Sequence, residues 1–359
     1  MAPKALIIGA TGQVGRSTTV ALQSEGWEVE VMHRSSGNTG LDTRTHIVDR
    51  NDLESIEKVL QTGYDAVIDL VAFDTNHVHP LLKHSKDIGS LVVLSSAAVY
   101  KDQQGRALQT AVDLDSSPVF DAPITEDNPV VSALEDSYAG RKRAMEIALL
   151  SSSESRVTII RPGGIHGPYS SQPREWFYVK RILDGRRIFL HGFGGRSSLH
   201  PTSVDNLSEM IRLAASNPGS RILNSGDPGL PDERYMAAAI ASAMDKSDLV
   251  QVLLPGVPAI ASPWSLPSPF FLSTEAAERE LDYKPVTTYA QTAVAIVQWI
   301  HEELASGEFQ QRLDKAFGVP GLGSQVFVGH GGAPFDYQVE DTILEQVRGS
   351  RHVENVQQP

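Results

Sequence analysis

The stretch that decides the fold reads Lys4-Ala5-Leu6-Ile7-Ile8-Gly9-Ala10-Thr11-Gly12-Gln13-Val14-Gly15. Its apolar beginning predicts a buried strand, and the G-x-x-G-x-x-G run that follows predicts a tight turn into a helix. A dinucleotide needs glycines here, because its pyrophosphate approaches the backbone closely and lies at the positive end of the helix. A structural turn would also use glycine, but the position between strand and helix favours a cofactor site. The expected cofactor contacts are Gly9, Thr11, Gly12, Gln13, Val14 and Gly15.

Working outward, short apolar runs alternate with amphipathic stretches, which is the pattern of strand-helix-strand units in a parallel sheet. We expect strands at 5–8, 29–32, 46–48, 66–70, 91–94 and 157–160, and helices at 14–25, 53–60, 78–86 and 136–150. Right-handed crossovers would wind them into an α/β, Rossmann-type, doubly wound sheet. The expected domains are a dinucleotide-binding domain over 1–165 with a surface insertion at 101–132, a smaller substrate-binding lobe mainly over 166–347 with segments returning to the sheet, and a frayed tail over 348–359.

Composition restricts the function classes. With 31 Lys and Arg against 44 Asp and Glu, the net charge is −13, which disfavours nucleic acid and anionic lipid as partners. Cysteine is absent, so thiolate chemistry is excluded, and the eleven histidines show no zinc-ligand spacing, so we expect no metal. No apolar run approaches the roughly 20 residues that span a bilayer. We expect a soluble, cytoplasmic protein that binds a small molecule.

The end of the second predicted strand indicates which dinucleotide binds. An NAD site usually has Asp or Glu there to bind the ribose hydroxyls. This chain has His33-Arg34-Ser35-Ser36 instead, and a guanidinium with hydroxyl groups suits a 2′-phosphate. We therefore expect NADP(H) rather than NAD(H), the alternative being that Arg34 is an ordinary surface residue. The further expected contacts are His33, Arg34 and Ser35 at the adenosine end, Asp49 and Arg50 after the third strand, and Leu70, Val71 and Ala72 after the fourth strand. Core packing would explain the last three residues equally well.

Two later motifs predict proton transfer. Ser96 follows the fifth predicted strand, and Tyr138 and Lys142 lie four residues apart on a predicted helix, which puts them on one face. A neighbouring ammonium group and a cationic nicotinamide would lower the pKa of the phenol. We expect Tyr138 to be the general acid or base, Lys142 to hold the ribose hydroxyls and lower that pKa, and Ser96 to orient the reacting oxygen. Tyr-x-x-x-Lys is common by chance, so the weight comes from the order of the motifs.

In that order, the glycine run, the serine after a strand and Tyr-x-x-x-Lys resemble the extended short-chain dehydrogenase/reductases, in particular the NAD-dependent epimerase/dehydratase family. Residues 161–168, Arg-Pro-Gly-Gly-Ile-His-Gly-Pro, resemble that family's R-P-x-x-x-Y-G-P segment beside the nicotinamide. His166 stands where tyrosine is usual. The resemblance covers roughly residues 4–300 and implies that Pro162, Gly163 and Gly164 contact the cofactor.

Departures from the family pattern bear on the reaction. The 4,6-dehydratases carry an Asp-Glu pair where this chain has Ala97-Ala98, so elimination of water is not expected. Residues 34–36, in contrast, resemble the NADP-binding turn of GDP-mannose 4,6-dehydratases. We expect an NADP(H)-dependent oxidoreductase that interconverts a hydroxyl and a carbonyl group. The substrate contacts expected are Phe73, Ser96, Ala97, Ala98, His166, Trp176 and Arg196.

Two other functions remain open at this point. One is a sugar-nucleotide epimerase that acts through a transient ketone with a retained NAD(P). The other is a non-catalytic NADP-binding regulator or RNA-associated scaffold, which the acidic net charge and the complete Ser-Tyr-Lys set disfavour. The resemblance also implies a homodimer through paired helices, which nothing in the residues themselves requires.

Overall fold

The computed structural model divides the chain into two compact units. Unit 1 consists of Met1–Ile165, Thr202–Gly226 and Leu272–Val286, and unit 2 consists of His166–Pro201, Asp227–Phe271 and Thr287–Pro359. The structure describes residues 2–34, 42–108, 115–152, 156–196, 198–254 and 262–307, together with 309, 335 and 337–349.

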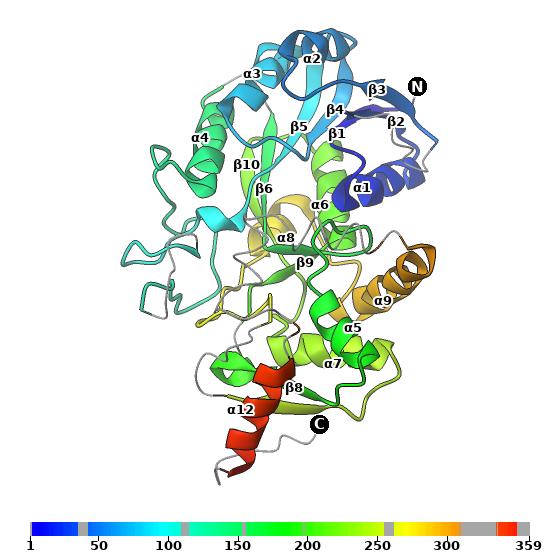
Figure 1. Cartoon of the computed structure of the whole chain (residues 1–359). Coiled ribbons are helices and arrows are strands. Elements are labelled where there is room, and N and C mark those ends of the chain that lie inside the picture. The colour runs from blue at the N-terminus through cyan, green and yellow to red at the C-terminus, as the bar shows by residue number, and fades with distance from the viewer. Residues whose placement is uncertain are drawn as a thin grey trace. The chain divides into compact units, whose positions relative to one another are not determined.

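A seven-stranded parallel sheet forms the centre of unit 1 (Figure 1). Its strand order is β10-β6-β5-β4-β1-β2-β3, so the chain turns one way from β1 to β3 and the other way from β4 to β6. The gap between β1 and β4 is the topological switch point at which ligands bind in such sheets. The strands are β1 (Lys4–Ile8), β2 (Glu28–His33), β3 (Arg44–Ile47), β4 (Tyr64–Asp69), β5 (Ile88–Leu94), β6 (Val157–Pro162) and β10 (Arg221–Ser225).

Helices cover both faces of this sheet, which is why its central strands are mainly apolar. Residues Ala5 to Ile8 of β1, for example, are at most 1% exposed. One apolar core joins α1, α6 and α8 to the sheet, and a second joins α2, α3 and α4 to it. The bounds are α1 (Gln13–Ser24), α2 (Leu53–Leu60), α3 (Thr75–Lys83), α4 (Tyr138–Leu150), α6 (Val204–Ser216) and α8 (Glu275–Leu281), with short 3-10 turns η1 (Ser85–Asp87) and η2 (Ala97–Val99). The predicted Rossmann-type fold is confirmed.

Strand register brings the carboxyl ends of the central strands to one edge. Ile8 pairs with Met32 and Asp69, Asp69 pairs with Val93, and Val93 pairs with Ile159. Because all of these strands are parallel, the segments that follow them leave the sheet side by side. Those segments begin at Gly9, Arg34, Leu70, Ser95 and Gly163.

Unit 2 has a core of its own, formed mainly by residues of α5, α7 and α9. Its C-terminal helix α12 is attached by a buried ion pair, in which Arg181 Nη2 lies 2.5 Å from Glu340 Oε1. A two-stranded sheet pairs β8 with β11. The elements of unit 2 are α5 (Trp176–Leu183), β8 (Ile188–His191), η4 (Gly192–Gly195), α7 (Glu233–Ala243), β11 (Val250–Leu253), α9 (Tyr289–Ser306) and α12 (Tyr337–Gly349). The paired short strands β7 (Gly164–His166) and β9 (Pro201–Ser203) each contain residues of both units.

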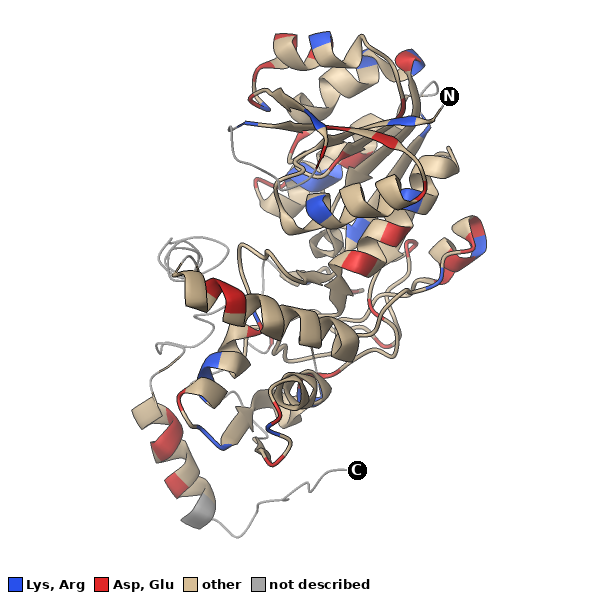
Figure 2. Ribbon diagram, turned by 90° about the vertical axis from the view of Figure 1, so that its right-hand side faces the viewer, with Lys and Arg blue, Asp and Glu red and all other residues tan. Residues whose placement is uncertain are grey.

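Charge and hydropathy add two observations. In Figure 2, acidic and basic residues are interspersed over the helices of unit 1. Among the helices of the described residues, none combines the length and the apolar character that crossing a bilayer requires.

Several local expectations are adjusted by the structure. The predicted helix 78–86 begins earlier, at Thr75, because Asp74 caps α3 by accepting from the backbone of Asn76 and His77. It also ends earlier, at Lys83, and the 3-10 turn η1 follows it. In the insertion 101–132, the described part is organised around Asp102. That buried carboxylate accepts from the backbone of Gln104, Arg106 and Val119 and from the guanidinium of Arg106. Residues 109–114 lie outside the described residues.

Candidate active site

The glycine run lies at the switch point and leads into α1. Gly9 has φ +92°, and a Cβ there would lie 2.7 Å from Val71 Cγ1. Both the backbone angle and the close approach of Val71 therefore favour glycine at this position. At Gly15 a Cβ would lie 2.4 Å from Ala10 Cα, because the first turn of α1 packs directly on the loop. Gly12 is different: its φ of −78° is ordinary, and the nearest atom to an added Cβ is 3.9 Å away. The fold alone does not require glycine at this position.

Space and unpaired donors lie together at Gly12. It is the N-cap of α1, where no side chain caps the helix and no acidic residue occupies the first turn. The free N–H groups and the dipole of a helix N-terminus favour an anion. Beside it, Gln13 has a buried Oε1 without a partner among the described residues. The N-terminus of α1 fits the pyrophosphate of a dinucleotide, whereas the Gln13 oxygen can only accept a hydrogen bond and does not itself favour an anion. Gly9, Thr11, Gly12, Gln13, Val14 and Gly15 all lie on the loop and the first turn.

The expected adenosine end lies at the end of β2. His33 is 7% exposed, and neither ring nitrogen has a hydrogen-bond partner among the described residues. Leaving such buried atoms unsatisfied costs free energy, so a ligand that bonds to them recovers it. Arg34 is exposed, and Ser35 lies outside the described residues.

Asp49 and Arg50 are engaged with the protein itself. Asp49 is exposed, and its Oδ1 accepts from the backbone and side chain of Asn51 at 2.8 and 3.0 Å, which makes a local turn. Arg50 Nη2 donates to the carboxylate of Asp69 and to the carbonyl of His77. Arg50 Nε and Nη1 are buried without partners among the described residues. Asp69 was not among the predicted site residues, although an acidic residue ending an apolar strand is a visible signal.

The loop after β4 forms one wall of the site. Asp69 Oδ1 accepts from the backbone of Val71 at 3.0 Å, which fixes the turn as it leaves the strand. Leu70 and Val71 are half-buried and Ala72 is buried, whereas Phe73 is 50% exposed. The expected wall thus ends in an exposed aromatic ring.

Ser96 and Tyr138 meet at the reactive end. Ser96 follows β5, and its hydroxyl oxygen accepts from the backbone of Ala98 at 3.2 Å. Ser137 caps α4 by accepting from the backbone of Gly140, so the helix begins at Tyr138. Burial raises the pKa of the Tyr138 phenol, and a hydrogen bond with Ser96 opposes that rise. The net direction is upward, opposite to the expected lowering, because burial outweighs the contact with Ser96.

Lys142 lies one turn further along α4 and is almost completely buried. Its Nζ donates to the carbonyls of Ala72 and Leu94 at 2.6 and 2.8 Å, and it lies 5.8 Å from the centre of the Tyr138 ring. Burial lowers the pKa of Lys142 to about 8, against the raising effect of Asp69 and Glu146. The three residues expected to carry proton chemistry therefore lie together in unit 1, with the ammonium group held by the backbone.

A buried polar network that was not predicted from the sequence supports this end of the site. Glu146 accepts from Arg161 Nε at 2.8 Å, from Arg161 Nη2 at 2.6 Å and from Ser95 Oγ at 2.6 Å. Arg161 Nη1 also donates to the hydroxyl of Tyr100. Although burial raises the pKa of Glu146, Arg161 and Ser95 lower it below the ordinary value. Glu146 lies four residues after Lys142, and this helical spacing was the available signal.

The other predicted contacts lie in two places. Pro162, Gly163 and Gly164 follow or end β6 in unit 1, where Gly163 N donates to Thr202 Oγ1 at 3.0 Å. Ala97 is buried and Ala98 half-buried in η2. Among the residues that the structure describes, no three His, Asp or Glu side chains are grouped to hold a metal ion.

In unit 2, His166 is fully enclosed, in contrast to its expected substrate contact. Its Nε2 lies 2.6 Å from Asp227 Oδ2, and this carboxylate outweighs burial and raises the pKa of His166. Trp176 is 6% exposed in the apolar core of the unit, where it packs on Phe309. Arg196 follows η4 and is exposed.

Comparison with known proteins agrees with this architecture. The sequence profile of the NAD dependent epimerase/dehydratase family matches residues 5–226. No curated protein matches the chain.

Solved structures show the same fold. A dTDP-glucose 4,6-dehydratase from Bacillus anthracis, in complex with NAD, is 17% identical over 85% of this chain and 98% of its own, with a TM-score of 0.63. A UDP-glucose 4-epimerase from Thermotoga maritima is 16% identical over 84% and 99%, with a TM-score of 0.64. A dTDP-glucose 4,6-dehydratase from Streptomyces venezuelae, with NAD bound, is 19% identical over 84% and 98%, with a TM-score of 0.62. At these identities the likeness establishes the fold.

Proposed function

This chain belongs to the NAD-dependent epimerase/dehydratase family, a family of enzymes, and from that premise we propose that it is an NADP(H)-dependent oxidoreductase. The reaction interconverts a hydroxyl and a carbonyl group on a small molecule. The observation that carries the proposal is the contact of the Tyr138 phenol with Ser96, one helical turn from Lys142. Ser96 follows β5, and Lys142 of α4 donates to the Leu94 carbonyl at the end of that strand, so these residues lie at the sheet edge from which the glycine run leaves β1.

Each of these side chains has a role that its surroundings support. When bound, the reduced nicotinamide supplies a hydride to the carbonyl carbon and is itself oxidised. The Tyr138 phenol gives its proton to the carbonyl oxygen, and its raised pKa keeps it protonated and ready to donate. The Ser96 hydroxyl, beside that phenol, orients the same oxygen. Lys142 holds the ribose hydroxyls, and its charge stabilises the tyrosinate that remains after proton transfer.

The choice of NADP(H) over NAD(H) rests on the end of β2. The sequence has no carboxylate there, neither ring nitrogen of His33 has a partner among the described residues, and Arg34 is exposed. Ser35 is assigned to the same 2′-phosphate from the sequence alone. Fluorescence titrations of wild type and Arg34→Ala with NADPH and NADH test this choice. We expect the variant to lose affinity for NADPH only, and equal binding of both cofactors by wild type would contradict it.

The general acid or base is tested by Tyr138→Phe. With a panel of aldehydes and ketones, NADPH oxidation should fall by about 10²- to 10⁴-fold, the usual contribution of a general acid, while NADPH binding is kept. Tyr235→Phe is the matched control, because that tyrosine is exposed on α7. Turnover at the wild-type rate in Tyr138→Phe would remove the basis of the proposal.

Epimerisation through a transient ketone is the second candidate, and the family match supports it. The same Ser-Tyr-Lys set would serve it, but the cofactor would stay bound through the cycle. Dehydration is disfavoured, because Ala97 and Ala98 supply neither the acid nor the base it needs. Mass spectrometry of the freshly purified protein separates the candidates: a retained NAD(P) favours the epimerase, and a freely exchanging NADPH favours the oxidoreductase. A cytoplasmic location and a homodimer stay predictions.

A further inference from the structure

One short loop, residues 70–74 between β4 and α3, contacts the side chains of both Tyr138 and Lys142. Its Ala72 carbonyl accepts from Lys142 Nζ at 2.6 Å. Its Phe73 ring meets the Tyr138 ring edge-on, with ring centres 6.4 Å apart, and lies 5.2 Å from Lys142 Nζ. The conformation of this loop therefore sets the environment of Tyr138 and Lys142 together.

His77 is the residue that fixes the outer end of the loop. Its Nδ1 accepts from the backbone N–H of Phe73 at 3.0 Å, and the two rings pack edge-on with centres 6.2 Å apart. Because the backbone nitrogen can only donate, Nδ1 carries the lone pair, and the neutral ring has its proton on Nε2. The side chain of His77 thus holds Phe73 in two ways, by its backbone and by its ring.

The backbone of His77 is anchored on both sides. Its N–H donates to Asp74 Oδ1 at 3.2 Å, in the cap of α3. Its carbonyl accepts from Arg50, whose same nitrogen is ion-paired with the fully buried Asp69. A chain of contacts therefore runs from the end of β4 through Arg50 and His77 to Phe73.

We propose that His77 is a positioning residue for the proton transfer assigned to Tyr138 and Lys142, and that it acts through Phe73. By holding the loop, it keeps the Phe73 ring against Tyr138 and the Ala72 carbonyl against Lys142. The inference rests on the proposed function. The effect of His77 on the pKa values of Tyr138 and Lys142 can nevertheless be measured in the cofactor-free protein, without a substrate.

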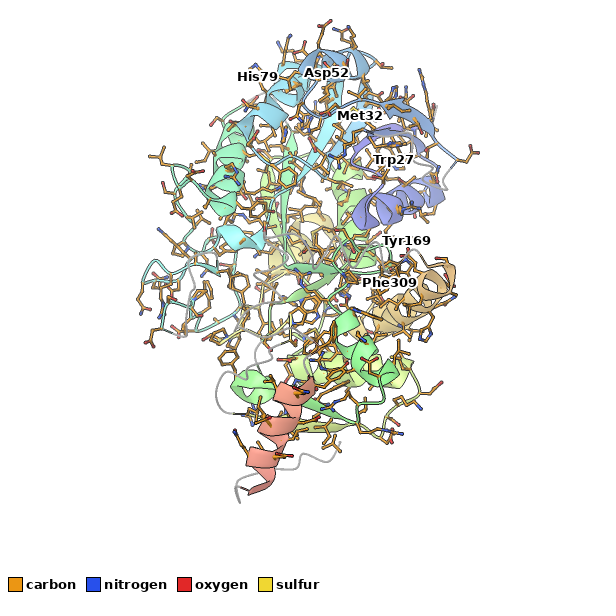
Figure 3. All side chains as sticks on the ribbon, viewed as in Figure 1. Trp27, Met32, Asp52, His79, Tyr169 and Phe309 are labelled. Atoms are coloured by element: carbon orange, nitrogen blue, oxygen red, sulfur yellow. The ribbon has the colours of Figure 1, made fainter. Side chains whose placement is uncertain are left out.

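The test compares three variants. His77→Leu removes the acceptor, His77→Asn keeps an acceptor oxygen near the place of Nδ1, and His79→Leu makes the same apolar change on the same helix. His79, which Figure 3 labels on α3, is exposed and serves as the matched control. NMR of ¹³Cζ-labelled tyrosine reports the pKa of Tyr138, and acetylation against pH, followed by mass spectrometry, reports the pKa of Lys142.

In His77→Leu we expect the loop to loosen and water to reach both groups. The pKa of Tyr138 should then fall from its raised value, and that of Lys142 should rise from about 8 toward its ordinary 10.5. Each unit of that rise lowers the fraction of free amine about tenfold below pH 8. His77→Asn and His79→Leu should keep the wild-type titrations. Wild-type titrations in a folded His77→Leu protein would overturn the proposal.

Phe73→Ala provides the second arm and keeps the test decisive if His77→Leu does not fold. The ring is half exposed, so its removal should be tolerated, and it should shift both titrations as His77→Leu does. In the double variant, His77→Leu should add nothing to the Tyr138 shift of Phe73→Ala, because both changes reach the phenol through the Phe73 ring. Additive shifts of the Tyr138 pKa, or no shift in Phe73→Ala, would contradict the proposed route. Full turnover of Tyr138→Phe, by contrast, would refute the proposed function without altering the titrations expected of the His77 and Phe73 variants.

Discussion

A single methyl group placed at Gly15 or at Gly12 should separate folding from cofactor binding. At Gly15 the new Cβ would lie 2.4 Å from Ala10 Cα and 2.7 Å from its carbonyl atoms, and ordinary contact begins at 3.4 Å. The loop must therefore move by about 1 Å, and overpacking of this kind costs about 1–3 kcal/mol. The better helix propensity of alanine returns at most about 1 kcal/mol. We expect Gly15→Ala to lower the free energy of unfolding by about 1–2 kcal/mol.

Gly12→Ala should behave in the opposite way. The nearest atom to its Cβ is 3.9 Å away and its backbone angles suit alanine, so the unfolding free energy should change by less than about 0.5 kcal/mol. The methyl group would, however, occupy the space in front of the helix N-terminus. Loss of one charge-assisted hydrogen bond, about 1.5 kcal/mol, would weaken cofactor binding at least about tenfold.

Two measurements on the same proteins check this pair. Urea denaturation followed by circular dichroism gives the stability of the cofactor-free variants. Quenching or enhancement of NADPH fluorescence gives the dissociation constant. If Gly15→Ala were as stable as wild type, or if Gly12→Ala bound NADPH normally, the roles assigned to the two glycines would be wrong.

Three further predictions concern charged groups of unit 1. Burial lowers the pKa of Lys142 from 10.5 to about 8, so between these pH values the unfolded chain binds the proton more tightly than the folded chain does. The free energy of unfolding of wild type, relative to that of Lys142→Met, should therefore rise by about 3 kcal/mol from below pH 8 to above pH 10.5. Denaturation at both pH values checks this, and a constant difference would speak against it. Glu146→Gln leaves the buried Arg161 charge poorly compensated and should cost about 3 kcal/mol in urea denaturation, whereas Glu146→Leu combined with Arg161→Met should cost less; equal losses would contradict the ion-pair argument. His33→Asp should weaken binding of NADPH relative to NADH at least about tenfold in fluorescence titrations, because a carboxylate repels a 2′-phosphate and binds ribose hydroxyls; an unchanged preference would place His33 outside the adenosine end.

The fold could be predicted because its signals are local. The apolar run of β1 and the glycines after it are contiguous, and Tyr138 and Lys142 share a helix face at a fixed spacing. The start of α4 at Tyr138 follows from Ser137, a typical capping residue that the sequence displays. Residues placed at strand ends also came together, because parallel strands deliver their carboxyl ends to one edge.

The contacts that hold the site could not be predicted in the same way. Arg50 follows β3 and Asp69 ends β4, and their ion pair depends on how the loops after those strands fold. Arg161 reaches Glu146 across the boundary between a strand and a helix, and the charge of neither residue indicates its partner. The place of His166 in the segment 161–168 did not indicate whether its side chain is exposed, and in the structure Asp227 and the surrounding packing enclose the ring.

The order in which unit 1 is assembled along the chain has a consequence for biosynthesis. The helix α6 and the edge strand β10 are synthesised after the first segment of unit 2, His166–Pro201, and the helix α8 is synthesised after its second segment, Asp227–Phe271. Until α6 is synthesised, the apolar faces of β4 and β5 that will pack on it, including Ala66 and Val92, have no cover from that helix. A nascent chain that stalls near residue 165 should therefore recruit chaperones, and a gene cut at that point should yield insoluble product.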